Sequence, residues 1–268
     1  MRRIAAILFF ALLASTSAFA ADPPQPVERE WKVGSDTRKA IVYAPTIAAK
    51  EPTPLVFAFH GHGGTMGHAA RTMAFQKQWP EAIVVYMQGL NTPGRLTDPE
   101  GKKSGWQPGQ GDQQDRDLKF FDAVLSSLKT DYKIDDKRIY ATGHSNGGSF
   151  TYLLWAARGD VFAAVAPSAA VPGKSAADLK PKPALHVAGE TDLLVKYNWQ
   201  KLAIERIKKL NGCDAEGKAW AKAGELTGME FTSKTETPFV VVTSPGGHQF
   251  PAEAPEMIVK FFKEHAKK

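Results

Sequence analysis

The feature that most constrains the fold is a short, mostly apolar run that recurs along the chain. Six such runs of five residues occur: "LVFAF" (55–59), "IVVYM" (83–87), "RIYAT" (138–142), "FAAVA" (162–166), "ALHVA" (184–188) and "FVVVT" (239–243). Continuous hydrophobicity over about five residues is typical of a strand covered on both faces. Two further runs, 27–33 and 39–43, are joined by "GSDT" and predict a hairpin. We therefore predict a mainly parallel central sheet.

Helix-length stretches separate these runs. Residues 115–129 place leucine and phenylalanine side chains on one stripe with acids in the first turn. Residues 199–210 repeat the pattern and stop before Gly212, and residues 255–265 open on a proline. Because strand and helix alternate, we predict an α/β fold with helices on both faces of the sheet.

The first twenty residues differ from the rest. Arg2 and Arg3 precede an apolar run over 4–14, and Ala18-Phe19-Ala20 ends the stretch. This pattern predicts a secretory signal peptide cleaved after Ala20, with a membrane anchor as the alternative, although the run is too short to span a bilayer. We expect residues 21–268 to form a single catalytic domain that is secreted or periplasmic and not held in a membrane.

Charge and cysteine content narrow the class of partner. The formal net charge is +6, but no dense basic stretch is interleaved with aromatic residues, so we do not expect nucleic acid as a partner. Cys213 is the only cysteine, which excludes an intrachain disulfide and a cysteine-based metal cluster. We interpret Cys213 as an inert structural thiol. The oligomeric state stays open.

The stretch "RIYATGHSNGGSF" (138–150) holds a G-x-S-x-G pattern around Ser145. The pattern alone is weak, and Ser145 could be a small residue at an ordinary bend. Here a predicted strand ends directly before Gly143 and a predicted helix follows Ser145, which is the setting the motif requires. The glycines remove side chains that would clash around a tight turn. We therefore predict that Ser145 is a nucleophile raised above the sheet edge.

A serine nucleophile needs a base, and the base needs an orienting carboxylate. His248 in "SPGGHQF" follows the last strand and precedes the last helix, whereas His144 points elsewhere and His186 lies inside a strand. Asp192 comes just beyond a strand end and is favoured over Glu190 as the acid. Nucleophile, acid and base then follow the chain order of α/β-hydrolases.

The loop "FAFHGHGGT" follows the first of the six runs and is rich in glycine, which leaves backbone amides unhindered. We predict an oxyanion hole made by the backbone N–H groups of His62 and Asn146. A rival interpretation makes His60 and His62 half of a metal site, but no Asp-His pair follows. We therefore predict neither a metal nor an organic cofactor.

Residues 89–117 are rich in glycine, proline, aspartate and glutamine and form a long stretch without an element of regular length. Such loops are often functional, and surface decoration is the alternative. We predict that Trp106 in this segment and Trp199 after the acid bind substrate by stacking on a phenolic or sugar ring. Core packing is an equal alternative for both.

The chain resembles the exported polyhydroxybutyrate depolymerase and feruloyl esterase family, which has the α/β-hydrolase fold. The resemblance rests on "LVFAFHGHGG", "IDDKRIYATGHSNGGSFTYLLW", "AGETDLLVKY" and "GGHQFPAEAPEMIVKFF". It implies Ser145 as nucleophile, Asp192 as acid, His248 as base and His62 as an oxyanion donor. Polymer-degrading members commonly carry disulfides and an added binding domain, and this chain has neither, which favours smaller soluble esters.

The resulting expectation is a secreted serine esterase that forms an acyl-enzyme. Its expected substrates are hydroxycinnamoyl, acyl-sugar or short hydroxyalkanoate esters, either small or oligomeric. The same three residues could serve a serine peptidase or an acyltransferase. A non-enzymatic function is the other alternative: an inactive hydrolase fold that binds polymer.

Overall fold

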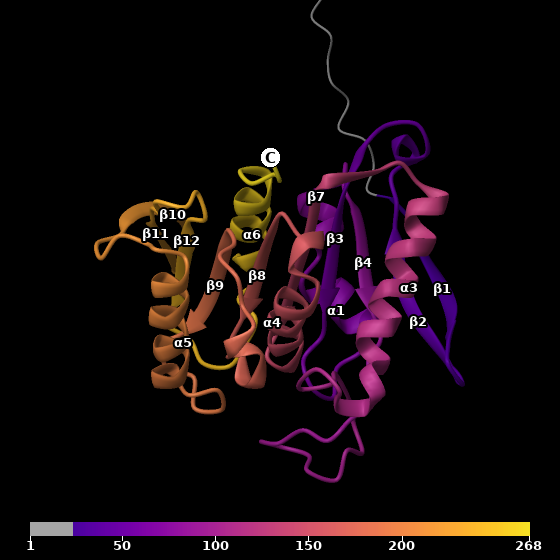
Figure 1. The fold of residues 1–268 in the computed structure, drawn as a ribbon, viewed down its shortest axis with the longest axis horizontal. Helices are drawn as coiled ribbons and strands as arrows, with labels where there is room; N and C mark the ends of the chain where they lie inside the picture. Colours follow the sequence, from indigo (N-terminus) through magenta and orange to yellow (C-terminus); the bar gives the residue numbers. More distant parts are fainter. Residues whose placement is uncertain (1–23) are drawn as a thin grey trace, which may run out of the picture.

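The computed structural model describes residues 24–268, so the predicted signal peptide (1–20) lies outside the described residues. Ten strands form one sheet in the order β1-β2-β4-β3-β7-β8-β9-β12-β11-β10 (Figure 1). Their bounds are β1 Pro26–Val33, β2 Asp36–Tyr43, β3 Thr53–Phe59, β4 Ile83–Met87, β7 Ile134–His144, β8 Ala164–Ser168, β9 Ala184–Gly189, β10 Lys218–Ala223, β11 Leu226–Phe231 and β12 Phe239–Ser244. All six apolar runs, and the hairpin before them, lie wholly or partly in strands as predicted.

The centre of the sheet is parallel. Strands β4, β3, β7, β8, β9 and β12 pair with one another in parallel register, whereas β2 pairs with β4 and β11 with β12 in antiparallel register. Hairpin β1–β2 closes one edge of the sheet and hairpin β10–β11 the other, both antiparallel. The sequence analysis missed β10 and β11 because they are half-exposed, with polar residues scattered through both strands. A partly exposed edge strand carries no continuous apolar run.

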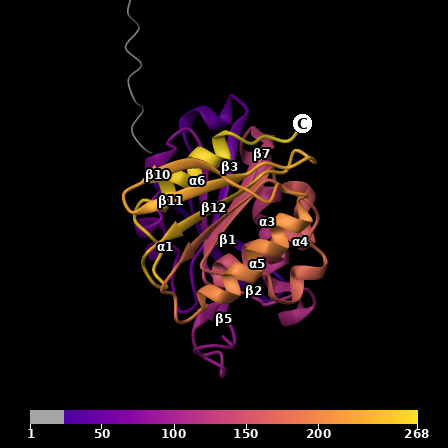
Figure 2. The ribbon, with the colours of Figure 1, turned by 90° about the vertical axis from the view of Figure 1, so that its left-hand side faces the viewer.

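Alternate residues of each central strand enter two separate cores. Along β3, Leu55, Phe57 and Phe59 pack on one face, whereas Val56 and Ala58 pack on the other. Helices α3 (Arg116–Asp131), α4 (Asn146–Arg158) and α5 (Tyr197–Leu210) cover the first face, and α1 (Met66–Thr72), α2 (Phe75–Gln78) and α6 (Ala254–Lys263) cover the second. The sheet therefore lies between two helix layers (Figure 2). The predicted fold class is confirmed.

The helices that were predicted begin and end close to the expected residues. Residues 24–268 contain six α-helices, α1 to α6, and the last four correspond to predicted helices. The first two were not predicted, because helices of seven and four residues are too short to display a helical repeat. None of the helices in residues 24–268 combines the length and the apolar character needed to cross a membrane.

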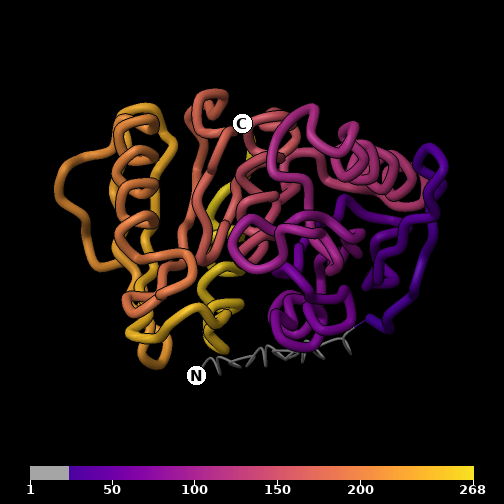
Figure 3. The backbone as a smooth tube through the Cα atoms, turned by 90° about the horizontal axis from the view of Figure 1, so that it is seen from below, coloured from indigo at the N-terminus to yellow at the C-terminus, as the bar shows by residue number. Residues whose placement is uncertain are grey.

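Residues 89–117 form a lobe below the carboxyl ends of the central strands (Figure 1). Within it, β5 (Leu90–Asn91) pairs with β6 (Ser104–Gly105) in a two-stranded ladder. Figure 3 shows the backbone from below, with this segment in purple to magenta on the side that faces the viewer. The segment therefore has regular structure that its composition did not reveal.

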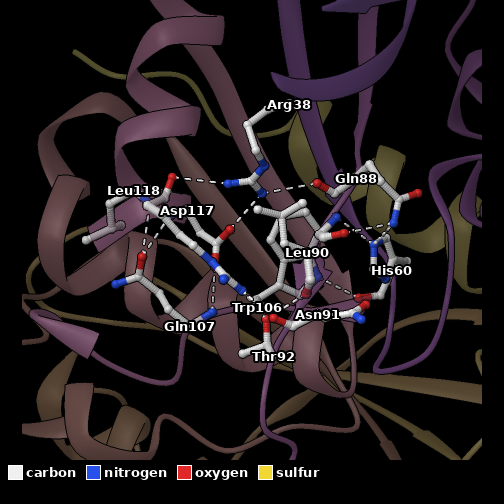
Figure 4. A network of polar contacts seen from close by, with 12 residues as sticks. Arg38, His60, Gln88, Leu90, Asn91, Thr92, Trp106, Gln107, Asp117 and Leu118 are labelled. Carbon is white, nitrogen blue, oxygen red and sulfur yellow. Dashed lines mark hydrogen bonds and ion pairs between the residues drawn. The ribbon is translucent and has the colours of Figure 1, made fainter. Parts of the chain in front are cut away.

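A buried ion pair fixes the start of α3 against β2 (Figure 4). Arg38 donates to the Asp117 carboxylate at 2.7 Å, and both side chains are fully buried. The same guanidinium donates to the backbone oxygens of Gln88 and Arg116, and the backbone N–H of Gln107 donates to Asp117. Burial lowers the pKa of Arg38, and the nearby Asp117 carboxylate has the smaller, opposite effect of raising it. The pair is stable only while each charge keeps its partner.

Asp117→Asn is expected to lower the free energy of unfolding by about 3–5 kcal/mol, because it leaves the Arg38 charge buried without a counter-charge. Urea denaturation would measure the loss. Lys39→Ala removes two exposed ion pairs to Glu28 and Glu30 and is the matched control, with an expected change of at most about 1 kcal/mol. Equal effects of the two substitutions would contradict this account of the pair.

Candidate active site

Three side chains that are far apart in the sequence meet at the carboxyl ends of the parallel strands. His248 Nε2 lies 2.8 Å from Ser145 Oγ, and His248 Nδ1 lies 2.7 Å from Asp192 Oδ2. Ser145 follows β7, Asp192 follows β9 and His248 follows β12. The structure therefore brings together the predicted nucleophile, acid and base in hydrogen-bond contact, in the arrangement of a serine-hydrolase triad.

The turn that carries Ser145 is strained and tightly packed. Ser145 has φ +56° and ψ −119°, a conformation that side chains rarely adopt. A Cβ at Gly143 would lie 2.4 Å from the oxygen of Gly147, and one at Gly147 would lie 2.3 Å from the oxygen of Phe59. Glycine at these two positions lets α4 approach the end of β3, and this approach lifts the Ser145 hydroxyl above the sheet.

Asp192 is 3 % exposed and is held by three donors besides His248. The backbone N–H groups of Leu194 and Val195 donate to Oδ1, and the Gln200 side chain donates to Oδ2. Glu190, the alternative acid, is exposed. These donors fix the orientation of the carboxylate, so Asp192 can orient the imidazole of His248.

The sequence analysis missed a role for His144, the residue before the nucleophile. Its Nε2–H donates to the backbone oxygen of His248 at 3.0 Å, and its Nδ1 lies 3.2 Å from Ser168 Oγ. Burial, with a smaller effect of His248, lowers the pKa of His144 to about 4. His144 is therefore neutral near pH 7 and anchors the loop that carries His248. No sequence pattern marks such a contact, because it depends on the packing of two distant loops.

The two predicted amide donors lie in turns beside Ser145. Asn146 opens α4, and His62 lies in the turn after β3. Within residues 24–268 neither backbone N–H donates to a protein acceptor. A carbon at the Cβ position of Gly61, next to His62, would lie 3.5 Å from Ser145 Cβ, so the turn passes directly over the nucleophile. Both groups therefore lie close to Ser145 without a protein acceptor within residues 24–268.

The two histidines of "HGH" face different partners. His60 Nδ1–H donates to the oxygen of Gly61, and its Nε2 accepts from the backbone N–H of Gly89. His62 Nε2–H instead donates to Asp98 at 3.0 Å. Residues 24–268 contain no group of three or more His, Cys, Asp or Glu side chains suited to a metal ion.

Cys213 lies apart from this site. Burial raises the pKa of its thiol, which disfavours the reactive thiolate.

The 89–117 segment holds the turn at His62 in place. Asp98 accepts from His62, Ser104 Oγ donates to the oxygen of Gly64, and the backbone N–H of Gly63 donates to Ser104. Asn146 is also tied to this segment, because its Oδ1 accepts from the backbone N–H of Trp106 at 2.7 Å. The side chains of both predicted donor residues are thus fixed by one segment.

The structure corrects the prediction for Trp106. Its side chain is fully buried, stacks on Phe150 at 5.0 Å between ring centroids, and donates from Nε1 to the oxygen of His60. It therefore packs in the core and cannot stack on a substrate. Trp199 is 41 % exposed on α5, within a group of exposed apolar residues that follows Asp192: Leu193, Leu194, Trp199 and Leu202.

Comparison with known proteins agrees with this architecture. Residues 100–181 match the prolyl oligopeptidase family. The chain is 26 % identical over 216 residues to a probable feruloyl esterase C of Aspergillus clavatus, covering 78 % of this chain and 76 % of that protein. It is 28 % identical to feruloyl esterase B of Piromyces equi over 71 % of this chain, but it spans only 36 % of that longer protein.

Among solved structures, an acetyl xylan esterase from Aspergillus awamori superposes with a TM-score of 0.65 at 13 % identity, over 88 % of this chain and 99 % of that one. This likeness establishes the fold. The chain has the α/β-hydrolase fold and is similar in sequence to feruloyl esterases. The relatives that it matches are named feruloyl esterase or acetylxylan esterase.

Gly147→Ala is expected to displace the nucleophile turn of the hydrolase, because the new methyl group would collide with the backbone at Phe59. Overpacking of this kind costs about 1–3 kcal/mol. We expect a lower free energy of unfolding and much slower labelling of Ser145 by a fluorophosphonate. Gly159→Ala, at the other end of α4, has its nearest atom at 3.8 Å and should leave both measurements unchanged. Normal labelling of Gly147→Ala would show that the turn tolerates a side chain.

Proposed function

We propose that this hydrolase is a serine carboxylic-ester hydrolase that works through an acyl-enzyme on Ser145. The observation that carries the proposal is the position of the His248 imidazole, which contacts the Ser145 hydroxyl at 2.8 Å and the Asp192 carboxylate at 2.7 Å. A serine hydroxyl needs such a base near neutral pH, and the base needs a carboxylate to fix its tautomer.

In the first half-reaction His248 Nε2 takes the Ser145 proton as Oγ bonds to the ester carbonyl carbon. The carbonyl oxygen becomes an oxyanion in the tetrahedral intermediate. His248 then returns the proton to the leaving alkoxide as its bond to carbon breaks, which frees the alcohol and leaves the acyl group on Ser145. Water, deprotonated by the same imidazole, attacks this acyl group, and Ser145 leaves as its hydroxyl with the carboxylic acid released.

The oxyanion is stabilised by the backbone N–H groups of His62 and Asn146. Asn146 lies at the N-terminus of α4, where unpaired amides and the helix dipole favour negative charge. Such donors accelerate acyl transfer because they are already oriented before charge develops, and one donor typically contributes about 3–4 kcal/mol. The contacts of Asp98 and Trp106 keep both turns in this orientation.

The substrates proposed are hydroxycinnamoyl, acyl-sugar or short hydroxyalkanoate esters. Relatives named feruloyl esterase and acetyl xylan esterase support the first two classes. Trp199 offers an exposed aromatic ring beyond Asp192 that suits a phenolic or sugar ring. The apolar N-terminal stretch with its small-residue end supports export of the protein as a secreted or periplasmic enzyme.

A serine peptidase is the second candidate, favoured by the match of residues 100–181 to the prolyl oligopeptidase family. The triad chemistry is the same for both substrates, so geometry at Ser145 does not separate them. A nitrophenyl ester and the matched nitroanilide amide would. Faster turnover of the amide would replace the esterase proposal with the peptidase.

Ser145→Ala is expected to lower kcat on nitrophenyl acetate by about 10⁴-fold or more while the free energy of unfolding is retained, because the acyl-enzyme cannot form without the nucleophile. Steady-state kinetics and urea denaturation would test this. Ser149→Ala, one turn later on α4, is the matched control and should keep most of its activity. More than a few per cent of activity in Ser145→Ala would remove Ser145 from this role.

Trp199→Ala is expected to raise KM for a feruloyl ester by about 3–10-fold with little change in kcat, because stacking of two aromatic rings contributes about 0.5–1.5 kcal/mol. Nitrophenyl acetate, which offers no feruloyl ring, should show a smaller change. Val27→Ala removes an exposed apolar side chain at the opposite sheet edge and controls for general surface effects. An unchanged KM for feruloyl, acetyl-sugar and hydroxybutyrate esters would exclude Trp199 from substrate binding.

A further inference from the structure

A chain of buried polar side chains extends from Asp192 into the core of the protein. Gln200 on α5 lies 3.0 Å from Asp192 Oδ2, His186 on β9 lies 3.1 Å from Gln200, and Tyr152 on α4 lies 2.9 Å from His186. Tyr152, His186 and Gln200 are fully buried. Polar groups are costly in such a position, and neither the fold nor the triad by itself requires them there.

The neighbours of each group settle the direction of every hydrogen bond. The Gln200 Nε2 atom faces both the Asp192 carboxylate and the backbone oxygen of Val195, which only accept, so it is the amide nitrogen. Gln200 Oε1 therefore accepts from His186 Nε2–H. The other ring nitrogen of a neutral imidazole is an acceptor, so His186 Nδ1 accepts from the Tyr152 hydroxyl. Every donor in the chain points toward Asp192.

The protonation states suit this direction. Burial lowers the pKa of His186 to about 4, so its imidazole is neutral, and burial raises the pKa of Tyr152, so its hydroxyl keeps the proton. Aligned hydrogen bonds in a low-dielectric interior polarise one another and strengthen the last bond. That last bond is the one from Gln200 to the acid of the triad.

We propose that Tyr152, His186 and Gln200 are positioning residues that fix the Asp192 carboxylate and draw charge from it, and so set how strongly Asp192 stabilises protonated His248. The inference rests on the proposed function, in which Asp192 orients the base. Asp192 shares its Oδ2 atom between Gln200 and His248. A donor on one side of this oxygen weakens its attraction for the proton on the other side. The chain thus keeps His248 able to act as a base at lower pH.

Few other titratable groups face the base. Within residues 24–268, Asp192 contacts His248 Nδ1. The centroid of the His144 ring lies 5.1 Å from that of the His248 ring, and His144 Nε2–H donates to the backbone oxygen of His248. His144 is neutral above about pH 4, as derived above, so it adds no charge that changes near neutral pH. A shift in the titration of His248 after substitution of Tyr152 or Gln200 is therefore attributable to Asp192.

The test compares Tyr152→Phe and Gln200→Leu with the unchanged protein in the pH profile of kcat/KM. Loss of donors leaves more charge on Asp192, which favours protonated His248, so the acid limb should move to higher pH by about half a unit. At pH 7 kcat should fall while KM changes little. Tyr152→Phe removes one oxygen atom far from the substrate, which keeps the test valid where Gln200→Leu fails to fold.

Tyr86→Phe is the matched control. Tyr86 is fully buried, like Tyr152, but lies on strand β4. Its hydroxyl donates to Gln76 and accepts from the backbone N–H of Phe75, and neither contact involves Ser145, Asp192 or His248. It should lose similar stability in urea denaturation while keeping the acid limb. A role confined to stability would give Tyr152→Phe and Gln200→Leu the same unshifted profile as Tyr86→Phe, and this result would overturn the proposal.

An NMR titration of the His248 ring separates this proposal from the proposed function, since it needs no substrate. A higher pKa of His248 in both chain variants supports the positioning role even where no ester is cleaved, and only the esterase proposal would then fail. Ester hydrolysis with an unshifted His248 pKa in both variants would overturn the positioning role and leave the esterase proposal in place.

Discussion

The site depends on one close approach of backbone to backbone, between the turn that carries Ser145 and the end of β3. The positive φ of Ser145 is unfavourable by itself and persists because the surrounding packing leaves no other conformation. That packing requires hydrogen atoms in place of side chains at Gly143 and Gly147. The same approach brings the amide of Asn146 and the turn at His62 to one side of the hydroxyl. Nucleophile and proposed oxyanion donors therefore share a single structural cause.

Much of the fold, and the three side chains that the structure brings together at Ser145, could be predicted from the sequence because both follow local patterns. The central strands are buried on both faces and appear as continuous apolar runs, and Ser145, Asp192 and His248 each follow one of these strands within a few residues. The edge hairpin β10–β11 could not be found, since its exposed side chains interrupt the pattern. Trp106 was misassigned for a related reason: an aromatic residue in a polar segment looks exposed, and only the packing against Phe150 shows that it is not.

The contacts that support the site escaped prediction because they join residues with no fixed spacing. His144 reaches the loop of His248 across 104 residues, and His186 in the predicted strand interior meets Gln200 and Tyr152 from two different helices. Each of these side chains is an ordinary core or turn residue when its local sequence is considered alone. Their polar atoms are satisfied by one another and by neighbouring groups such as Ser168, Asp192 and the backbone oxygen of Val195, so the fold must place all of them correctly before any is stable.

The 89–117 segment supports the proposed site although little of it is regular secondary structure. Its own contacts include a two-residue ladder and a turn around Asp98, yet it holds His62 by a carboxylate and Asn146 by the backbone of Trp106. Trp106 is in turn held by the core. Displacement of the segment would therefore remove contacts of both proposed oxyanion donor residues, whereas the hydrogen bonds that join Ser145, His248 and Asp192 do not involve the segment. The proposed oxyanion donors thus share with Ser145 the close approach of α4 to β3, and the packed loop adds a second support for them. The proposed base is supported elsewhere, by the buried polar side chains behind Asp192.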